Sequence, residues 1–118
     1  MRDHTNMIAW QKAREVALGC LRLAKASWRP YAAPGYEQLT KAAVSVQLNI
    51  AEGYALWTTP KKRQHWRTAY GSAVETVECL EFLRDGGAAP RAECDRLIGL
   101  AREVSRILLA LVRKRSPG

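Results

Sequence analysis

The sequence has little of what metal, redox and membrane chemistry require. Its 118 residues include three cysteines, two histidines, two methionines and one phenylalanine. No apolar run approaches the roughly 18–20 residues of a membrane-spanning helix, and the first residues lack the apolar stretch of a secretory signal peptide. The odd cysteine count, without a CxxC spacing, favours free thiols over a disulfide framework. We therefore expect a cytoplasmic protein that does not enter the membrane.

Negative charge is also scarce. The chain has 11 Asp and Glu residues against 19 Lys and Arg residues, for a net charge of +8. Hydrophobic residues make up 47% and charged residues 25% of the sequence, as in ordinary globular domains. The length fits one domain, which we expect to span residues 1–118. The positive excess favours a polyanionic partner and has no bearing on the fold.

Proline and glycine divide the chain into four segments that follow the helical period. The breaks lie at residues 29–35 and 86–90, with a weaker one at 58–60, where Thr59 can cap a helix and Pro60 suits its first turn. None of the segments alternates with the period of a strand. Four helices with short connections predict an all-α fold, an antiparallel up-down-up-down four-helix bundle.

Three apolar stripes at helical spacing predict the core. They are Trp10, Ala13, Ala17, Cys20, Leu21, Ala24 and Trp28 in the first segment, Trp66, Ala69, Tyr70, Ala73, Val77 and Leu80 in the third, and Cys94, Leu97, Ala101, Val104, Leu108 and Leu111 in the fourth. The fourth segment has further apolar residues outside its stripe: Ile98, Leu100, Ile107 and Leu109. This surplus suggests a second buried face on the last helix, against another subunit.

A narrow polar stripe crosses the otherwise apolar second segment. It consists of Gln38, Lys41, Ser45, Asn49 and Glu52, and the third segment offers Thr68, Ser72 and Glu75. If the stripes face each other, they form a hydrogen-bonded network that fixes the helix register. The alternative, a ligand site, lacks a general base or an electrophile. Gly53 and Gly71 are expected to mark close approaches between helices.

Basic residues gather where the third helix is expected to begin. Lys61, Lys62, Arg63 and Arg67 come first, and Glu75, Glu78 and Glu81 follow, an order that opposes the helix macrodipole. Trp57, His65 and Trp66 lie among these cations, and aromatic rings beside cations suit a sugar-phosphate partner. Alternatively, the cations only solvate the end of the bundle while the tryptophans join the core. Arg113, Lys114 and Arg115 offer a further basic patch.

The sequence lacks the residue patterns of catalysis. Glu75 and Glu78 have no histidine at the spacing that di-metal bundles use. Cys79 and Cys94 lie on or beside apolar stripes, as small core residues do. There is no nucleophile elbow and no glycine-rich phosphate loop. We therefore expect a protein that is not an enzyme and that has no metal or other cofactor.

Two motifs resemble a known family. Ser45-x-x-x-Asn49-Ile-Ala-Glu52-Gly53, followed by Gly71-Ser72-Ala-x-Glu75, resembles the four helix bundle protein family, whose founding members are encoded in intervening sequences of large-subunit ribosomal RNA genes. The resemblance runs from about Trp10 to Arg113 and implies protomers that assemble into homopentamers. Similar proteins include the accessory variability determinants of diversity-generating retroelements, which imply nucleic acid and a reverse transcriptase as partners. Residues 55–63 are more basic than the family pattern.

Two functions fit these observations. The first is a homo-oligomer, a pentamer if the family's assembly holds, that binds RNA or DNA through phosphate contacts from the two basic patches, without reading sequence. The second is a protein-interaction adaptor whose basic residues attract an acidic protein partner and which has no direct role with nucleic acid. A pull-down after nuclease treatment separates the two, because an association bridged by nucleic acid would be lost.

Overall fold

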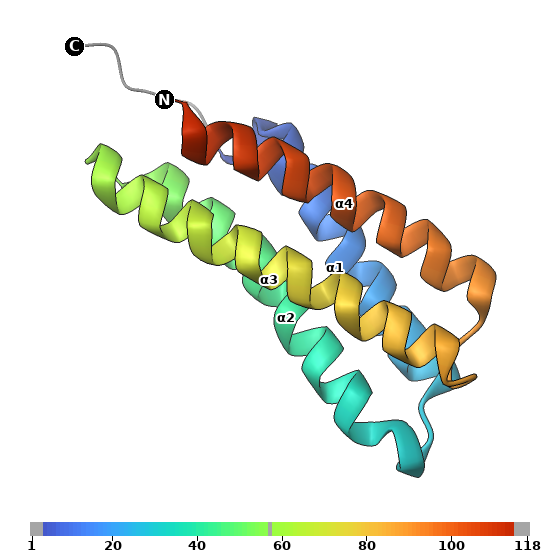
Figure 1. Cartoon of the computed structure of the whole chain (residues 1–118). Coiled ribbons are helices and arrows are strands. Elements are labelled where there is room, and N and C mark those ends of the chain that lie inside the picture. Colours follow the sequence, from blue (N-terminus) through green and yellow to red (C-terminus); the bar gives the residue numbers. More distant parts are fainter. Residues whose placement is uncertain (1–3, 57, 115–118) are drawn as a thin grey trace.

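The computed structural model describes residues 4–56 and 58–114. It contains four long helices, α1 (Ile8–Ser27), α2 (Ala33–Ala55), α3 (Thr59–Asp85) and α4 (Arg91–Arg113), with short 3-10 helices η1 (His4–Asn6) and η2 (Pro30–Ala32). The long helices alternate in direction along a body of 51 × 23 × 21 Å (Figure 1). Within the described residues there is no strand. The predicted antiparallel four-helix bundle is thus confirmed.

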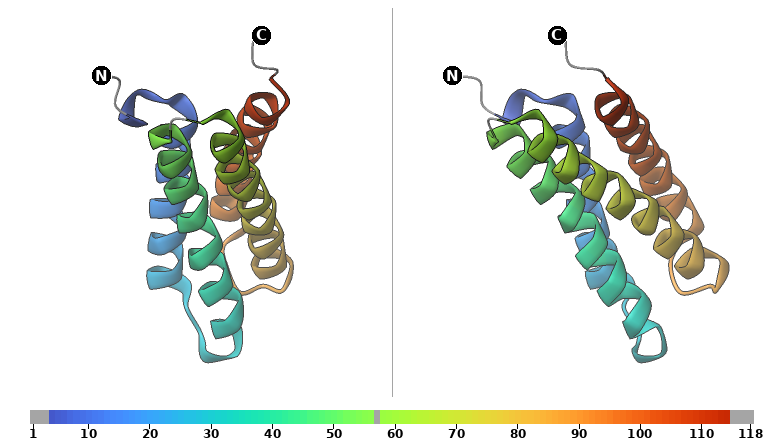
Figure 2. Two further views of the ribbon diagram at one scale, coloured as in Figure 1. Left: turned by 90° about the vertical axis from the view of Figure 1, so that its left-hand side faces the viewer. Right: turned by 60° about the vertical axis from the view of Figure 1, so that its left-hand side comes forward.

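Each helix packs against two others. α1 and α3 both lie beside α2 and α4, so the bundle has a roughly square section. Figure 2 shows that α1 and α3 begin at the same end of the bundle, where α2 and α4 finish. The α1–α2 and α3–α4 connections lie at the opposite end. Features of the start of α3 and the end of α4 are therefore neighbours in space.

The helix boundaries differ from the sequence prediction in two places. α2 already begins at Ala33, so Pro34 lies in its first turn, where a missing N–H costs nothing. α3 begins at Thr59 with Pro60 in its first turn, but its capping residue is Thr58, and no side chain caps the helix. The turn before α4 contains Gly87 with φ of 73°, a left-handed conformation that favours glycine.

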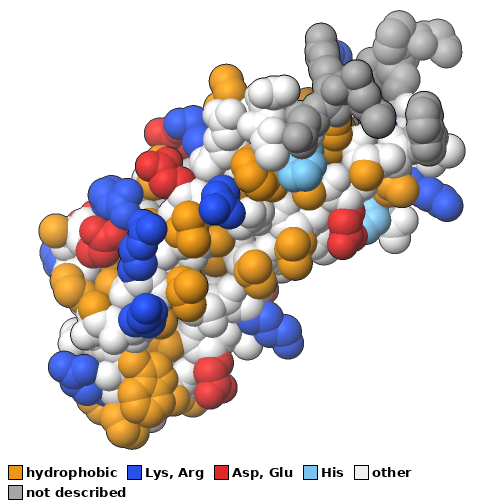
Figure 3. Space-filling view, turned by 180° about the vertical axis from the view of Figure 1, so that it is seen from behind, with side chains coloured by type: hydrophobic (Ala, Val, Ile, Leu, Met, Phe, Trp, Pro, Cys, Tyr) orange, Lys and Arg blue, Asp and Glu red, His pale blue; other side chains and the backbone are white. Residues whose placement is uncertain are grey.

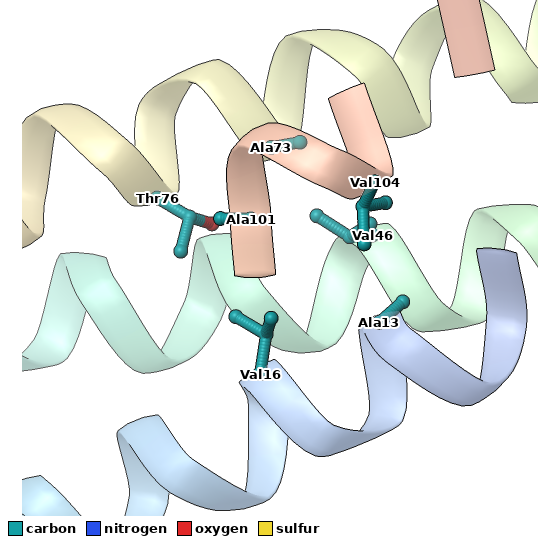
Figure 4. Close-up of a pocket in the computed structure, with 7 residues that line it drawn as sticks. All are labelled: Ala13, Val16, Val46, Ala73, Thr76, Ala101 and Val104. Carbon is teal, nitrogen blue, oxygen red and sulfur yellow. The ribbon is translucent and has the colours of Figure 1, made fainter. Parts of the chain in front are cut away.

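The core has two clusters of buried side chains, which meet near the middle of the bundle. One cluster includes Leu80, Leu83 and Leu97, and the other includes Ile50 and Leu108. Small side chains line the middle and leave a void of only about 10 Å³ (Figure 4); they are Ala13, Val16, Val46, Ala73, Thr76, Ala101 and Val104. The hydroxyl of the fully buried Thr76 donates to the Ser72 carbonyl at 2.8 Å, so its polar atom is satisfied.

The predicted stripes of α3 and α4 are confirmed as core, with Trp66, Tyr70 and Leu111 partly buried against it. The stripe of α1 is partly wrong. Leu21 and Trp28 are 50% and 46% exposed, while the buried residues are Ala9, Ala13, Val16, Gly19, Cys20 and Leu23. Small residues let α1 lie close to its neighbours: a Cβ on Gly19 would come 2.4 Å from Cδ2 of Leu97. Leu21 consequently lies on the outer side of α1.

Most of the surplus apolar surface of α4 is used within the protomer, although Leu109 stays partly exposed. Ile98 is buried in the core, and Leu100 and Ile107 pack against it. α4 uses this surface within the protomer because both α1 and α3 lie against it. Among the residues that the structure describes, the exposed large apolar side chains all lie on other parts of the chain: Ile8, Leu21, Trp28, Tyr31, Val44, Leu48, Val74 and Phe82.

The cysteines are free, as predicted. Cys20 and Cys94 are buried and Cys79 is partly buried. Burial raises the pKa of the Cys20 thiol to about 12, so this thiol stays protonated at neutral pH. Of the helices described, none is long and apolar enough to cross a membrane.

Candidate nucleic-acid interface

The two basic patches of the sequence form a single surface. Arg63, in the first turns of α3, donates a hydrogen bond to the backbone carbonyl of Lys114, just after the last turn of α4. A cation is favourable there, because the last carbonyls of a helix carry partial negative charge. We call this surface the basic end; its members are Lys61, Lys62, Arg63, Arg67, Arg113 and Lys114. Arg115 and Trp57, which the sequence also nominated, lie outside the described residues.

The basic end differs from the opposite end in ion pairing. At the opposite end, Arg84 contacts Asp85 at 2.8 Å and Asp95 at 2.9 Å. Nearby on α4, Arg96 contacts Glu93 at 2.7 Å. In residues 4–56 and 58–114, by contrast, no carboxylate pairs with any member of the basic end. Most of its positive charge is thus uncompensated by any described carboxylate and open to an anionic partner.

The aromatic side chains around these cations are arranged differently from the sequence prediction. Trp66 turns inward, and its indole Nε1 donates to the Ile50 carbonyl at 3.5 Å. His65 faces Asn49 of α2 and is also not free to stack on a base. Instead, Nζ of Lys62 lies 5.9 Å from the ring centroid of Tyr54. Tyr54 was not predicted from the sequence, although its place in the last turn of α2 puts it next to the start of α3.

A network of polar side chains joins α2 and α3. The hydroxyl oxygens of Ser45 and Ser72 are 2.9 Å apart, as predicted from the two facing stripes. Nδ2 of Asn49 donates to the carbonyl and the hydroxyl of Ser45 at 2.9 and 3.1 Å. We call this network the polar seam; its members are Ser45, Asn49, Glu52, His65 and Ser72.

His65 completes the polar seam, a role that was not predicted from the sequence. Its Nδ1 lies 3.0 Å from Oδ1 of Asn49 and 3.3 Å from Oε2 of Glu52. Both oxygens only accept, so Nδ1 carries a proton and donates. No described side chain has a buried polar atom that lacks a partner. This complete satisfaction supports the structural interpretation of the polar stripe over a ligand site.

Other members of the two stripes have separate surroundings. Glu75 accepts a hydrogen bond from Nε2 of Gln38 at 2.8 Å and does not join Ser72. Lys41 is exposed on the outer side of α2, and Thr68 bonds to the carbonyl of Gln64 within its own helix. Across the described parts of the chain, no three His, Cys, Asp or Glu side chains lie close enough to share a metal ion.

The two glycines of the motifs differ. A Cβ on Gly53 would lie 2.5 Å from Nε1 and 2.7 Å from Cδ1 of Trp66, which confirms the predicted close approach. A Cβ on Gly71 would meet nothing within 4 Å, so the prediction for this position is wrong. Gly71 lies on the outer side of α3, where no other helix of the protomer comes near.

The substitution Asn49→Ala tests the role of the polar seam. It removes the bonds to Ser45 and His65, and we expect a loss of about 1 kcal/mol in the free energy of unfolding, measured with urea. Gln64→Ala, at an exposed position of α3, is the control and should change stability by less than about 0.5 kcal/mol. Nucleic-acid binding should be unchanged; lost binding at unchanged stability would show that the polar seam is a ligand site.

The fold and the surface together define a class: a small all-α four-helix bundle in which the polar seam joins α2 to α3 and one end is strongly basic. The chain belongs to the 23S rRNA-intervening sequence protein family, whose model matches residues 5–110. Its fold is similar to the crystal structure of a protein with unknown function from the S23 ribosomal protein family of Bacteroides thetaiotaomicron, with a TM-score of 0.81 and 18% identity. That match covers 91% of this chain and 100% of the other. No curated protein matches the chain.

Proposed function

We propose that this protein is a non-enzymatic homo-oligomer that binds nucleic acid through phosphate contacts from its basic end. The observation that carries the proposal is the set of cations at one end of the bundle, none of which has a carboxylate partner among the described residues. Phosphates are the anions that such an exposed cluster of lysine and arginine attracts most generally.

The charge order of α3 supports a binding role. Lys61 and Lys62 lie in its first turns, where the helix macrodipole disfavours positive charge. Cations that oppose the macrodipole weaken the helix, so their presence is better explained by a partner than by stability. A sequence reader is not needed for such contacts, and binding should tolerate many sequences.

Assembly increases the effect of each basic end. In a pentamer, the form that the family resemblance implies, five basic ends act on one strand, and linked weak contacts give much higher total affinity. Such a particle suits a role alongside ribosomal RNA or as an accessory to a reverse transcriptase.

Salt titration and native mass measurement test the proposal. If all six cations of one basic end contact phosphates of a duplex, the logarithm of the binding constant should fall with the logarithm of salt concentration with a slope of about −5. The purified particle should have the mass of an oligomer, with extra mass that nuclease removes. A binding constant that does not respond to salt would contradict the nucleic-acid part of the proposal. A particle with the mass of a monomer would contradict the oligomeric part.

An acidic protein partner is the second candidate, because the same unpaired cations would attract carboxylates. The nuclease treatment separates the two: an association that survives it, together with weak and salt-independent nucleic-acid binding, favours the adaptor.

A further inference from the structure

The face formed by α1 and α2 contains a shallow groove. Its volume is about 410 Å³, and its lining residues are Ala17, Leu18, Leu21, Thr40, Lys41, Val44 and Gln47. Leu21 and Val44 are 50% and 44% exposed, and Leu48 beyond them on α2 is 53% exposed. Figure 3 shows apolar side chains along this face with lysines and arginines between them. We call this surface the α1–α2 groove.

The α1–α2 groove has a mostly basic surround. Lys41 lines it, and Arg14 lies one turn before Leu18 on the same side of α1. Glu37, one turn before Lys41, is the acidic residue on this side of α2. Apolar side chains so exposed favour burial by a partner, and the cations favour a partner with carboxylates.

A surface with that chemistry exists on the same chain, on the outer side of α3. Val74 and Phe82 are 43% and 69% exposed, and Glu75 and Glu78 are exposed beside them. Positions 74, 78 and 82 are four apart and lie on one side of the helix. We call these four residues the α3 ridge. Val74 and Phe82 thus combine exposed apolar surface with two exposed carboxylates on the same side of one helix.

The dimensions of the two surfaces also agree. Eight positions separate Val74 from Phe82, which is about 12 Å along a helix. The lining residues on α2 run from Thr40 to Gln47 and the exposed Leu48 follows directly, so the α2 side of the groove has a similar length of about 10–12 Å. Two copies that joined groove to groove would instead bring Arg14 and Lys41 close to the same cations of the partner, which is unfavourable.

We propose that the α3 ridge of one copy docks into the α1–α2 groove of the next, so that the subunits join head to tail. Val74 and Phe82 would enter the groove between Leu21 and Leu48, and Glu75 and Glu78 would lie near its cations. A contact between two different surfaces leaves one of each free, and it forms a closed ring when the rotation between neighbouring subunits closes. This inference rests on the proposed oligomer and assigns the two faces that form it. It leaves the basic end of each subunit uncovered.

Charge reversal tests the pairing of faces. Lys41→Glu and Glu78→Lys each place like charges together and should raise the dissociation constant of the oligomer about tenfold or more, as measured by sedimentation over a range of concentrations. The double variant restores opposite charges and should recover most of the loss. Phe82→Ser should weaken the oligomer similarly by removal of an anchor. Ile8→Ser changes an apolar residue that is 61% exposed outside both surfaces and should leave the mass unchanged.

The outcomes separate this inference from the proposed function. An oligomer that Lys41→Glu, Glu78→Lys and Phe82→Ser leave intact would overturn the assigned faces while the oligomer itself stands. Failure of the double variant to recover would also overturn them. A wild-type monomer at every concentration would overturn both the faces and the proposed assembly. Binding of a single protomer to a short oligonucleotide, measured on the same variants, reports on the basic end independently.

Discussion

Neutralising part of the basic end is expected to reduce nucleic-acid affinity on the order of 100-fold at about 0.1 M salt. The variant combines Lys61→Gln, Lys62→Gln and Arg67→Gln. Each lost phosphate contact should also lower the steepness of the salt dependence by about one. Fluorescence anisotropy with one labelled RNA at several salt concentrations measures both quantities. The fold should tolerate the changes, because all three side chains project from the first turns of α3 and none joins the core.

The control removes the same charge from the opposite end. Arg22, Arg29 and Arg91 are exposed there, and their change to Gln lowers the net charge equally. This variant should lose much less affinity. Equal losses from both variants would show that net charge alone attracts the polyanion, and no loss from either would contradict the proposed function.

The basic-end variant should also be slightly more stable than the wild type. Two of its three substitutions, at Lys61 and Lys62, remove positive charge from the first turn of α3, where the macrodipole is unfavourable to cations. A gain in stability together with a loss of binding would show that these residues contribute to binding a partner and not to the stability of the fold. Thermal unfolding without nucleic acid checks this sign.

The second large effect concerns Gly53. Its substitution by alanine is expected to lower the free energy of unfolding by about 1–2 kcal/mol, because overpacking costs more than the improved helix propensity returns. The added Cβ would lie 2.5 Å from Nε1 of Trp66, and a rigid indole in a packed position cannot yield easily. The ring or α2 must therefore move, with loss of the bond from Trp66 to the Ile50 carbonyl.

Gly99→Ala is the matched control. It is the same chemical change in a helix interior, but a Cβ there meets nothing within 4 Å. Its effect should have the opposite sign, a gain of about 0.4–1 kcal/mol. Trp66→Phe removes Nε1, the atom nearest to the added Cβ, so Gly53→Ala should cost less in that background. Additive losses in the double variant would contradict the steric explanation.

The sequence allowed the fold to be predicted because its patterns are local. Helical period and Pro/Gly breaks are properties of neighbouring residues, and the apolar stripe of α4 repeats at spacings of three and four. The stripe of α1 was predicted only in part because helix rotation is decided by packing. Both sides of α1 contain apolar residues, and the side with Ala9, Ala13 and Gly19 turns inward because it permits the closer approach.

Candidate site residues were predictable to a smaller extent. Ser45 and Ser72 could be paired from their stripes, but the partner of His65 depends on how α3 rotates against α2. The union of the two basic patches likewise depends on Arg63 reaching the end of α4, a contact between residues 51 positions apart. Charge counts along a sequence do not show which cations will find carboxylates, and that distinction is what singles out the basic end.

The shared position of the start of α1 and the end of α4 has a practical consequence for protein engineering. A fluorescent protein or affinity tag fused at either terminus emerges beside the basic end, where it can shield the cations from a long polyanion. A tag inserted in the turn at Gly86–Gly87, between α3 and α4, emerges at the far end of the bundle instead. Binding assays on this protein should therefore use an untagged chain or the internal insertion, since terminal fusions would lead to an underestimate of affinity.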